Sequence, residues 1–136
     1  MTQVDFQKLK LFFENELKIT EQNIMEKSIQ LSNFYSKTLQ IYSKELRILK
    51  MKKVEMDKTF GELYHKYKFK YDFQLDTKAE VETYIKSDDI YYKLALEYAQ
   101  QEVQVNFLEQ TLGQINNMGY RIKNFIDLKK ISQGMM

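Results

Sequence analysis

The stretch 64–71 places lysines between aromatic residues, reading Tyr-His-Lys-Tyr-Lys-Phe-Lys-Tyr. Binding of single-stranded nucleic acid without sequence preference needs cations that replace the counterions of the phosphates, and flat faces on which bases stack. This stretch supplies both kinds of group. It therefore predicts a nucleic-acid-binding site, in which each stacked base would contribute about 1–3 kcal/mol.

The positive charge extends into the residues before this stretch. Residues 44–70 hold nine Lys or Arg against four acids, 72–109 hold three against nine, and 121–136 hold four against one. The net charge of +2 hides this division, and a binding surface depends on how charge is distributed. The candidate DNA-binding residues are Arg47, Lys50, Lys52, Lys58, Tyr64, Lys66, Tyr67, Lys68 and Lys70.

The same stretch also has a structural interpretation. From position 67 to 75 apolar and polar residues alternate, which is the period of an extended segment. One buried face of an edge strand would then form, with the lysines outward as protection against aggregation. That face would consist of Phe69, Tyr71, Phe73 and Leu75. Spacing does not distinguish the two interpretations, and both stay open.

The groups that enzymes need are scarce. His65 is the only histidine, there is no cysteine, and the four glycines stand apart instead of forming a phosphate loop. Asp88 and Asp89 are neighbours whose side chains would point apart on a helix, so capping of a helix start is the better interpretation. We expect no enzyme, no cofactor, no metal site and a solvated His65.

The composition also bears on the compartment. The lack of cysteine excludes a disulfide framework and suits a reducing compartment. No apolar run approaches the roughly 18–20 residues that a membrane span needs, and charged residues interrupt the first apolar patch, unlike in a signal peptide. We expect a soluble intracellular protein that does not contact a membrane.

Long helices must position these residues, because the chain has no Pro and only four Gly. A capping pattern at Thr2 predicts a short helix over 1–19, and Thr20 can cap a long basic helix over 20–68. Apolar residues in the long helix recur in steps of four and three, as in a coiled-coil seam. This first seam consists of Tyr35, Leu39, Tyr42, Leu46, Leu49, Lys53, Met56, Phe60, Leu63 and Tyr67.

An extended connector over 69–76 is expected to lead into return helices over 77–118. Thr77 with Glu80 forms a capping box, and Ser87-Asp88-Asp89 looks like a break with a new cap. The second seam consists of Tyr91, Leu94, Tyr98, Gln101, Val105, Leu108, Leu112, Ile115, Gly119 and Ile122.

Two heptad helices on either side of a short segment should fold back on each other. The expected fold class is all-α: a long antiparallel helical hairpin with heptad seams, short N-terminal and C-terminal helices, and a short extended, β-like segment around 67–75. A single domain over 1–136 is expected.

Lys53 and Gln101 are polar exceptions in the two seams. If Tyr67 faces a residue near Asp88, Lys53 falls opposite Gln101 or Glu102. A buried polar pair of this kind fixes register at some cost in stability. The alternative is that Lys53 extends to solvent.

Both long helices carry more apolar residues than one seam needs. The surplus residues are Ile41, Ile48, Val54, Ile90, Val103 and Phe107. The N-terminal helix is too short to cover them all, which favours self-association. A monomeric three- or four-helix bundle is the alternative.

The C-terminal sequence resembles a known family. Residues 117–131 read Asn-Met-Gly-Tyr-Arg-Ile-Lys-Asn-Phe-Ile-Asp-Leu-Lys-Lys-Ile, and Gly134 follows. This resembles the ending of the bacteriophage recombination mediator UvsY family: a Gly-aromatic-x-Ile-Lys sequence, an Asp four residues on and a glycine close to the terminus. Residues 35–37, 52–54 and 87–89 and the total length are also similar.

The resemblance implies a ring-shaped homo-oligomer, hexameric or heptameric, held largely through C-terminal helices. It also implies binding of single-stranded DNA, loading of a RecA-like recombinase and displacement of single-strand-binding protein, in the cytoplasm of the infected bacterial host. Of the family's DNA-contacting basic residues, only Lys58 has a matching position here, because the family's glycine turn is missing at 66–69.

The segment 119–136 would hold the ring together. Its candidate oligomerisation residues are Gly119, Tyr120, Ile122, Phe125 and Ile126. Gly119 would be a helix break or a close approach of backbones between protomers, with an ordinary C-cap as the alternative. The rival function is a helical coiled-coil adaptor or phage assembly protein without DNA binding.

Overall fold

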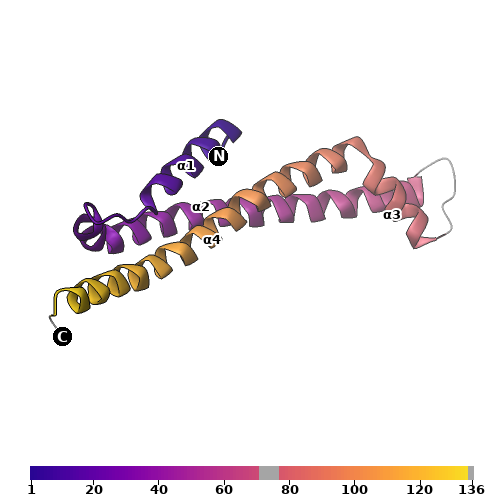
Figure 1. The fold of residues 1–136 in the computed structure, drawn as a ribbon. Coiled ribbons are helices and arrows are strands. Elements are labelled where there is room, and N and C mark those ends of the chain that lie inside the picture. The colour runs from indigo at the N-terminus through magenta and orange to yellow at the C-terminus, as the bar shows by residue number, and fades with distance from the viewer. Residues whose placement is uncertain (71–76, 135–136) are drawn as a thin grey trace. The chain divides into compact units, whose positions relative to one another are not determined.

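The computed structural model describes residues 1–70 and 77–134, and the regular elements within them are helical. The expected all-α class is therefore confirmed. In chain order (Figure 1) the elements are α1 (Gln3–Glu16), α2 (Ile24–His65), the π-helix η1 (Lys66–Lys70), α3 (Lys78–Ser87) and α4 (Asp89–Ser132).

The helices form two compact units. We call residues 1–44 with 106–136 the terminal unit and residues 45–105 the central unit. In each unit a stretch of α2 packs antiparallel against a stretch of α4 (Figure 1), which confirms the hairpin prediction within each unit. A single domain over 1–136 stays a prediction.

In the terminal unit, α1 is held by aromatic rings. Phe6 and Phe13 are buried, and their ring centroids lie 5.4 Å and 6.1 Å from that of Phe107 on α4. Phe13 also lies 5.9 Å from Phe34 on α2. Because Phe107 lies off the predicted seam, α1 covers part of the surplus apolar surface, as the sequence indicates.

In the central unit, α3 packs across the end of α2. Leu63 of α2 forms a buried cluster with Val81 and Ile85 of α3. Four half-buried aromatic residues pack around this cluster: Phe60, Tyr64, Tyr67 and Tyr91. Aromatic rings contribute large apolar area, which explains how a helix as short as α3 is held.

The second seam is confirmed. In part of the first seam, the buried residue lies one position before the predicted one. Gln101, Val105, Leu108, Leu112, Ile115 and Ile122 are all buried on α4. On α2 the buried positions include Thr38 and Glu45, while Leu39 is 40% exposed. Thr38 tolerates burial because its hydroxyl donates to the carbonyl of Phe34 at 2.8 Å. Apolar spacing alone missed these positions because their residues are polar.

The predicted pairing of Lys53 with Gln101 or Glu102 is wrong. The Gln101 Nε2 donates to the Glu45 carboxylate at 2.7 Å and to the Glu45 carbonyl at 2.9 Å. Lys53 is instead exposed, with its Nζ 3.1 Å from Asp57, and this contact raises the pKa of Lys53 above its ordinary 10.5. The alternative, in which Lys53 extends to solvent, is therefore confirmed.

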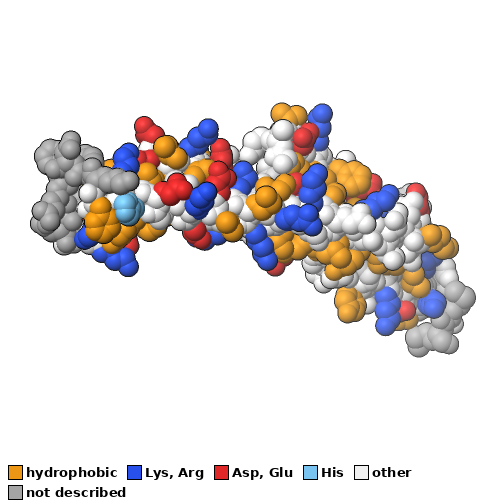
Figure 2. All heavy atoms as spheres, turned by 180° about the vertical axis from the view of Figure 1, so that it is seen from behind, with side chains coloured by type: hydrophobic (Ala, Val, Ile, Leu, Met, Phe, Trp, Pro, Cys, Tyr) orange, Lys and Arg blue, Asp and Glu red, His pale blue; other side chains and the backbone are white. Residues whose placement is uncertain are grey.

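Several surplus apolar residues stay at the surface. Val54, Ile90 and Val103 are each more than half exposed. Figure 2 shows hydrophobic side chains, in orange, reaching the surface among charged ones. Self-association stays a prediction, supported by this exposure.

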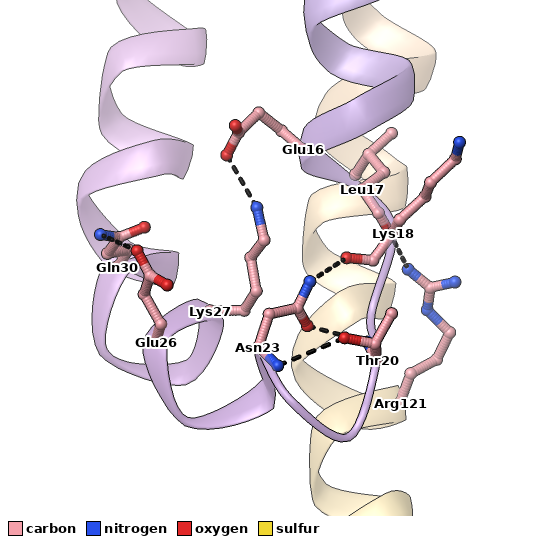
Figure 3. Close-up of polar contacts among 9 residues, drawn as sticks. All are labelled: Glu16, Leu17, Lys18, Thr20, Asn23, Glu26, Lys27, Gln30 and Arg121. Atoms are coloured by element: carbon pink, nitrogen blue, oxygen red, sulfur yellow. Dashed lines mark hydrogen bonds and ion pairs between the residues drawn. The ribbon is translucent and has the colours of Figure 1, made fainter.

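The turn before α2 is built from reciprocal hydrogen bonds (Figure 3). The Thr20 N–H donates to Asn23 Oδ1 at 2.8 Å, and the Asn23 N–H donates to Thr20 Oγ1 at 3.3 Å. The helix therefore begins at Ile24, four residues after the predicted cap. Arg121 of α4 donates to the carbonyl of Leu17 at 3.1 Å and joins the turn to α4.

The other predicted caps are confirmed. The Thr2 hydroxyl accepts from the Asp5 N–H at 3.1 Å, and the Thr77 hydroxyl accepts from the Glu80 N–H at 3.1 Å. Asp88 separates α3 from α4 as expected. Short polar side chains satisfy helix-end N–H groups, so these boundaries follow from local sequence.

The predicted extended segment is wrong over 67–70, where the backbone is π-helical; residues 71–75 lie outside the described part. The alternating pattern did not predict the conformation here, because the rings it placed on one strand face lie on different sides of the helix. The Tyr67 ring lies 5.7 Å from the Tyr84 ring, and the Phe69 ring lies 5.1 Å from the His65 ring.

The predicted helix break at Gly119 is also wrong, because α4 runs unbroken from Asp89 to Ser132. For the same reason Gly119 is not a C-cap. Within the chain, a Cβ at Gly119 would lie 3.3 Å from the side-chain atom Leu31 Cδ2. A close approach of backbones between protomers stays a prediction.

Candidate nucleic-acid interface

A stripe of cations runs along the face of α2 that points away from α4 in the central unit. We call Arg47, Lys50, Met51, Val54 and Lys58 the outer stripe; their spacing places them on one helix face, opposite the buried Glu45 and Leu63. All five are exposed, Met51 at 65% and Val54 at 68%. Blue cations and orange hydrophobic side chains both reach the surface toward the left of Figure 2.

The cations of α2 differ in availability. Lys58 Nζ lies 4.0 Å from Glu62, and both side chains are largely exposed, so this pair contributes well under about 1 kcal/mol. A phosphate can therefore replace Glu62 at little cost. Lys52 is half-buried with its Nζ 3.9 Å from Glu97 of α4, which places Lys52 in the helix–helix contact and off the outer stripe.

Tyr64 and Tyr67 are half-buried and pack within the central unit. Tyr64 lies 6.4 Å from Phe60, ring to ring. The Tyr67 hydroxyl donates to Asp88 Oδ2 at 2.7 Å, which agrees with the expectation that Tyr67 faces a residue near Asp88. DNA binding by the two tyrosines stays a prediction, but much of each ring is occupied in packing.

The environment of Asp88 favours its charged form. Partial burial by itself raises the pKa of the carboxyl group. Hydrogen bonds from the Tyr67 hydroxyl and from the backbone N–H groups of Ile90 and Tyr91 outweigh this effect, so the pKa falls below its ordinary 3.8. Asp88 thus holds a charge while joining Tyr67 of η1 to the start of α4.

In η1 the predicted lysines lie in different surroundings. Lys66 is exposed with its Nζ 5.3 Å from the centre of the Tyr67 ring, and Lys68 is half-buried. The side chain of Lys70 lies outside the described part of the structure.

Phe69 was missed as a candidate binding residue. Its side chain is 69% exposed, and its ring centroid lies 5.1 Å from that of His65, which is also exposed. Alternation placed Phe69 on a buried face. Its spacing of four from His65, in a continuing helix, was the available signal.

The predicted oligomerisation residues divide into two groups within the terminal unit. Ile122 is buried and Gly119 lies close to Leu31 within the chain, and their part in oligomerisation stays a prediction. Tyr120 is 70% exposed. Phe125 and Ile126 line a groove of about 280 Å³ at the start of α2 and the end of α4, together with Ile24, Met25, Ser28, Lys129, Lys130 and Gln133.

Two further apolar residues of α4 that the sequence pattern did not single out are exposed. Leu128 is 67% and Ile131 is 56% exposed, and with Tyr120 they follow helical spacing along the face opposite the buried Ile122. We call Tyr120, Leu128 and Ile131 the outer face of α4. An apolar helix face left in water indicates an interaction surface.

The described residues offer neither a metal site nor a membrane-spanning helix. Within residues 1–70 and 77–134, no three His, Cys, Asp or Glu side chains come together as metal ligands. None of the described helices combines the length and the apolar character that a membrane crossing requires.

Comparison with known proteins identifies one family. The family model described as "Recombination, repair and ssDNA binding protein UvsY" matches residues 12–135. No curated protein sequence matches the chain.

The fold is similar to that of solved structures. Crystal structures of the bacteriophage T4 recombination mediator protein UvsY match with TM-scores of 0.83 and 0.82. The first, lattice type II, is 17% identical and covers 98% of each chain; the second, lattice type IV, is 16% identical and covers 93% of this chain and 98% of that one. At these identities the structural likeness establishes the fold.

Proposed function

Because the chain belongs to the UvsY family of recombination, repair and single-stranded-DNA-binding proteins, we propose that it binds single-stranded DNA through the central unit and loads a RecA-like recombinase. In this role it displaces single-strand-binding protein in the cytoplasm of an infected bacterial host. It needs no chemistry of its own for this task.

The outer stripe is the observation that supports DNA binding most directly. Arg47, Lys50 and Lys58 point into solvent from one rigid helix, and the one ion pair described among them, at Lys58, is weak. Phosphates would release their counterions on binding these cations, which gives affinity without sequence preference. Met51 and Val54, between the cations, offer apolar contact to sugars and bases.

We also propose that several copies assemble into a ring through the outer face of α4 and the groove beside Phe125. The exposed apolar residues of the terminal unit support this assignment. A ring allows each site to be weak, because after the first contact the others form at high effective concentration. Such an assembly can hold a strand and present it to the recombinase.

Titration with oligo-dT at several salt concentrations tests DNA binding. The logarithm of the affinity should fall linearly with the logarithm of salt, by roughly 0.7 per phosphate contact. Replacing Arg47, Lys50 and Lys58 together by Ala should flatten this slope. The matched control replaces Lys78, Lys86 and Lys93, three exposed lysines of the same unit, and should change the slope less.

The results of these titrations separate the candidate functions. No binding at low salt would overturn the proposal and favour an adaptor or assembly protein. Equal slopes in the two triple variants would remove the outer stripe from the site.

A second experiment tests recombinase loading. The ATPase activity of a RecA-like recombinase on strands covered by single-strand-binding protein should rise when the chain is added. An unchanged ATPase rate would contradict the proposed role as a mediator.

A further inference from the structure

Exposed phenylalanine and tyrosine rings are few in the described part of the central unit. They are Phe69 at 69%, Tyr92 at 62% and Tyr84 at 41% exposure. Tyr92 and Tyr84 belong to the acidic return helices, whereas Phe69 follows the basic stretch of α2. Only Phe69 therefore combines an open ring face with surrounding positive charge.

The position of Phe69 continues the outer stripe. His65 lies seven residues after Lys58, two helical turns further along the same face. The Phe69 ring lies 5.1 Å from the His65 ring with 50° between the planes, so the histidine supports one edge of the phenylalanine. Lys66 is exposed beside them.

Folding does not account for an open phenylalanine at this place. The central unit already buries Leu63, Val81 and Ile85, and Phe69 adds nothing to that cluster. It stands in a π-helical turn, a conformation that occurs often at functional sites. The π-helical turn departs from α-helical geometry where α2 ends and carries the ring at its surface.

We infer that Phe69, supported by His65, is the platform on which a DNA base stacks at the end of the outer stripe. This inference rests on the proposed DNA binding and assigns the base contact to a residue other than Tyr64 and Tyr67. Phosphates lie along Arg47, Lys50 and Lys58, and the strand ends its path with a base against the open face of Phe69. A flat ring accepts any base, in keeping with binding that ignores sequence.

The test compares oligo-dT with an abasic oligomer of the same length, which keeps the phosphates and lacks the bases. The unaltered chain should prefer oligo-dT. Phe69→Ala should lower affinity for oligo-dT by about five-fold or more while leaving abasic binding and the salt dependence unchanged. Phe69→Leu keeps apolar bulk without a flat ring and should behave like Phe69→Ala. Tyr92→Ala, which removes an equally open ring, is the matched control and should keep the preference.

A second variant supplies a direct signal. The chain contains no tryptophan, so Phe69→Trp introduces a single tryptophan fluorophore. Its emission should be quenched by oligo-dT and not by the abasic oligomer, because quenching by stacking requires a base.

The outcomes keep this inference separate from the proposed function. Equal binding of both oligomers by the unaltered chain, or a preference that survives in Phe69→Leu, would overturn the platform and leave DNA binding through phosphates intact. Absence of binding to either oligomer would overturn the proposed function itself. Emission of Phe69→Trp that is unchanged by bound oligo-dT would show that the ring faces something other than a base.

Discussion

At the scale of single residues, one hydrogen bond of 2.7 Å joins Tyr67 of η1 to Asp88, the residue between α3 and α4. The pKa of Asp88 lies below 3.8 because hydrogen bonds outweigh the effect of partial burial. A carboxyl group whose pKa is lowered by folding stabilises the fold above the unfolded pKa. That stability is lost as pH falls through the folded value.

Tyr67→Phe removes the hydroxyl donor and should lower the free energy of unfolding by about 1 kcal/mol at pH 7. The difference from the unaltered chain should shrink as pH falls from about 4 downward, where Asp88 becomes protonated in both proteins. Urea unfolding at several pH values measures it. A difference that stays constant down to pH 2 would contradict this account of Asp88.

Glu45 and Gln101 form a second polar contact, here in the buried seam. Gln101→Leu leaves the Glu45 carboxylate without its amide donor and should cost about 1.5–3 kcal/mol of unfolding free energy. Replacing both residues by Leu should recover most of that loss, since neither polar group is then left buried without the other. Urea unfolding of Gln101→Leu, Glu45→Leu and the double variant gives the coupling free energy between the two residues. Additive losses of unfolding free energy would mean that the contact contributes little.

At the scale of helices, the glycines of α4 differ in their surroundings. A Cβ at Gly113 meets no atom within 4 Å, whereas one at Gly119 meets Leu31 at 3.3 Å. Gly113→Ala should therefore stabilise the chain by about 1 kcal/mol through helix propensity, and Gly119→Ala should gain less because Leu31 must shift. Thermal unfolding distinguishes them. A larger gain at Gly119 would indicate that Leu31 moves without cost.

The parts of the fold that sequence predicts are those set by local interactions. Thr2 and Thr77 satisfy N–H groups three residues away, so their caps are visible without a partner helix. The second seam is also visible, since its apolar residues are buried. The first seam cannot be predicted without its partner helix, because the buried Glu45 is a polar residue that Gln101 of α4 contacts.

The candidate site likewise has a part that the sequence predicts and a part that depends on packing. The basic character of α2 is evident in its composition, and Arg47, Lys50 and Lys58 are exposed as a basic face requires. Which aromatic ring is open depends on packing of α3, which covers Tyr64 and Tyr67 and leaves Phe69 exposed. No spacing rule at 64–71 contains that information.

At the scale of the whole molecule, assembly depends on apolar side chains that the chain does not bury itself. Leu128→Asp with Ile131→Asp should give smaller species in sedimentation, because two charges would be placed in the interface between copies. Helix content should not change, since both residues are exposed. Val103→Asp, at a residue of the central unit that is 61% exposed, is the control. Assemblies of unchanged size would remove the outer face of α4 from the interface.

Because the outer stripe lies on one uninterrupted helix, the distance between its first and last cations is fixed. Arg47 and Lys58 are eleven residues apart, which corresponds to about 16 Å along the helix axis. A single strand that keeps the stacked spacing of duplex DNA, about 3.4 Å per nucleotide, needs about five nucleotides to cover that distance. A shorter oligomer can contact Arg47 or Lys58 but not both. The affinity should therefore rise sharply near this length instead of rising evenly with each added nucleotide.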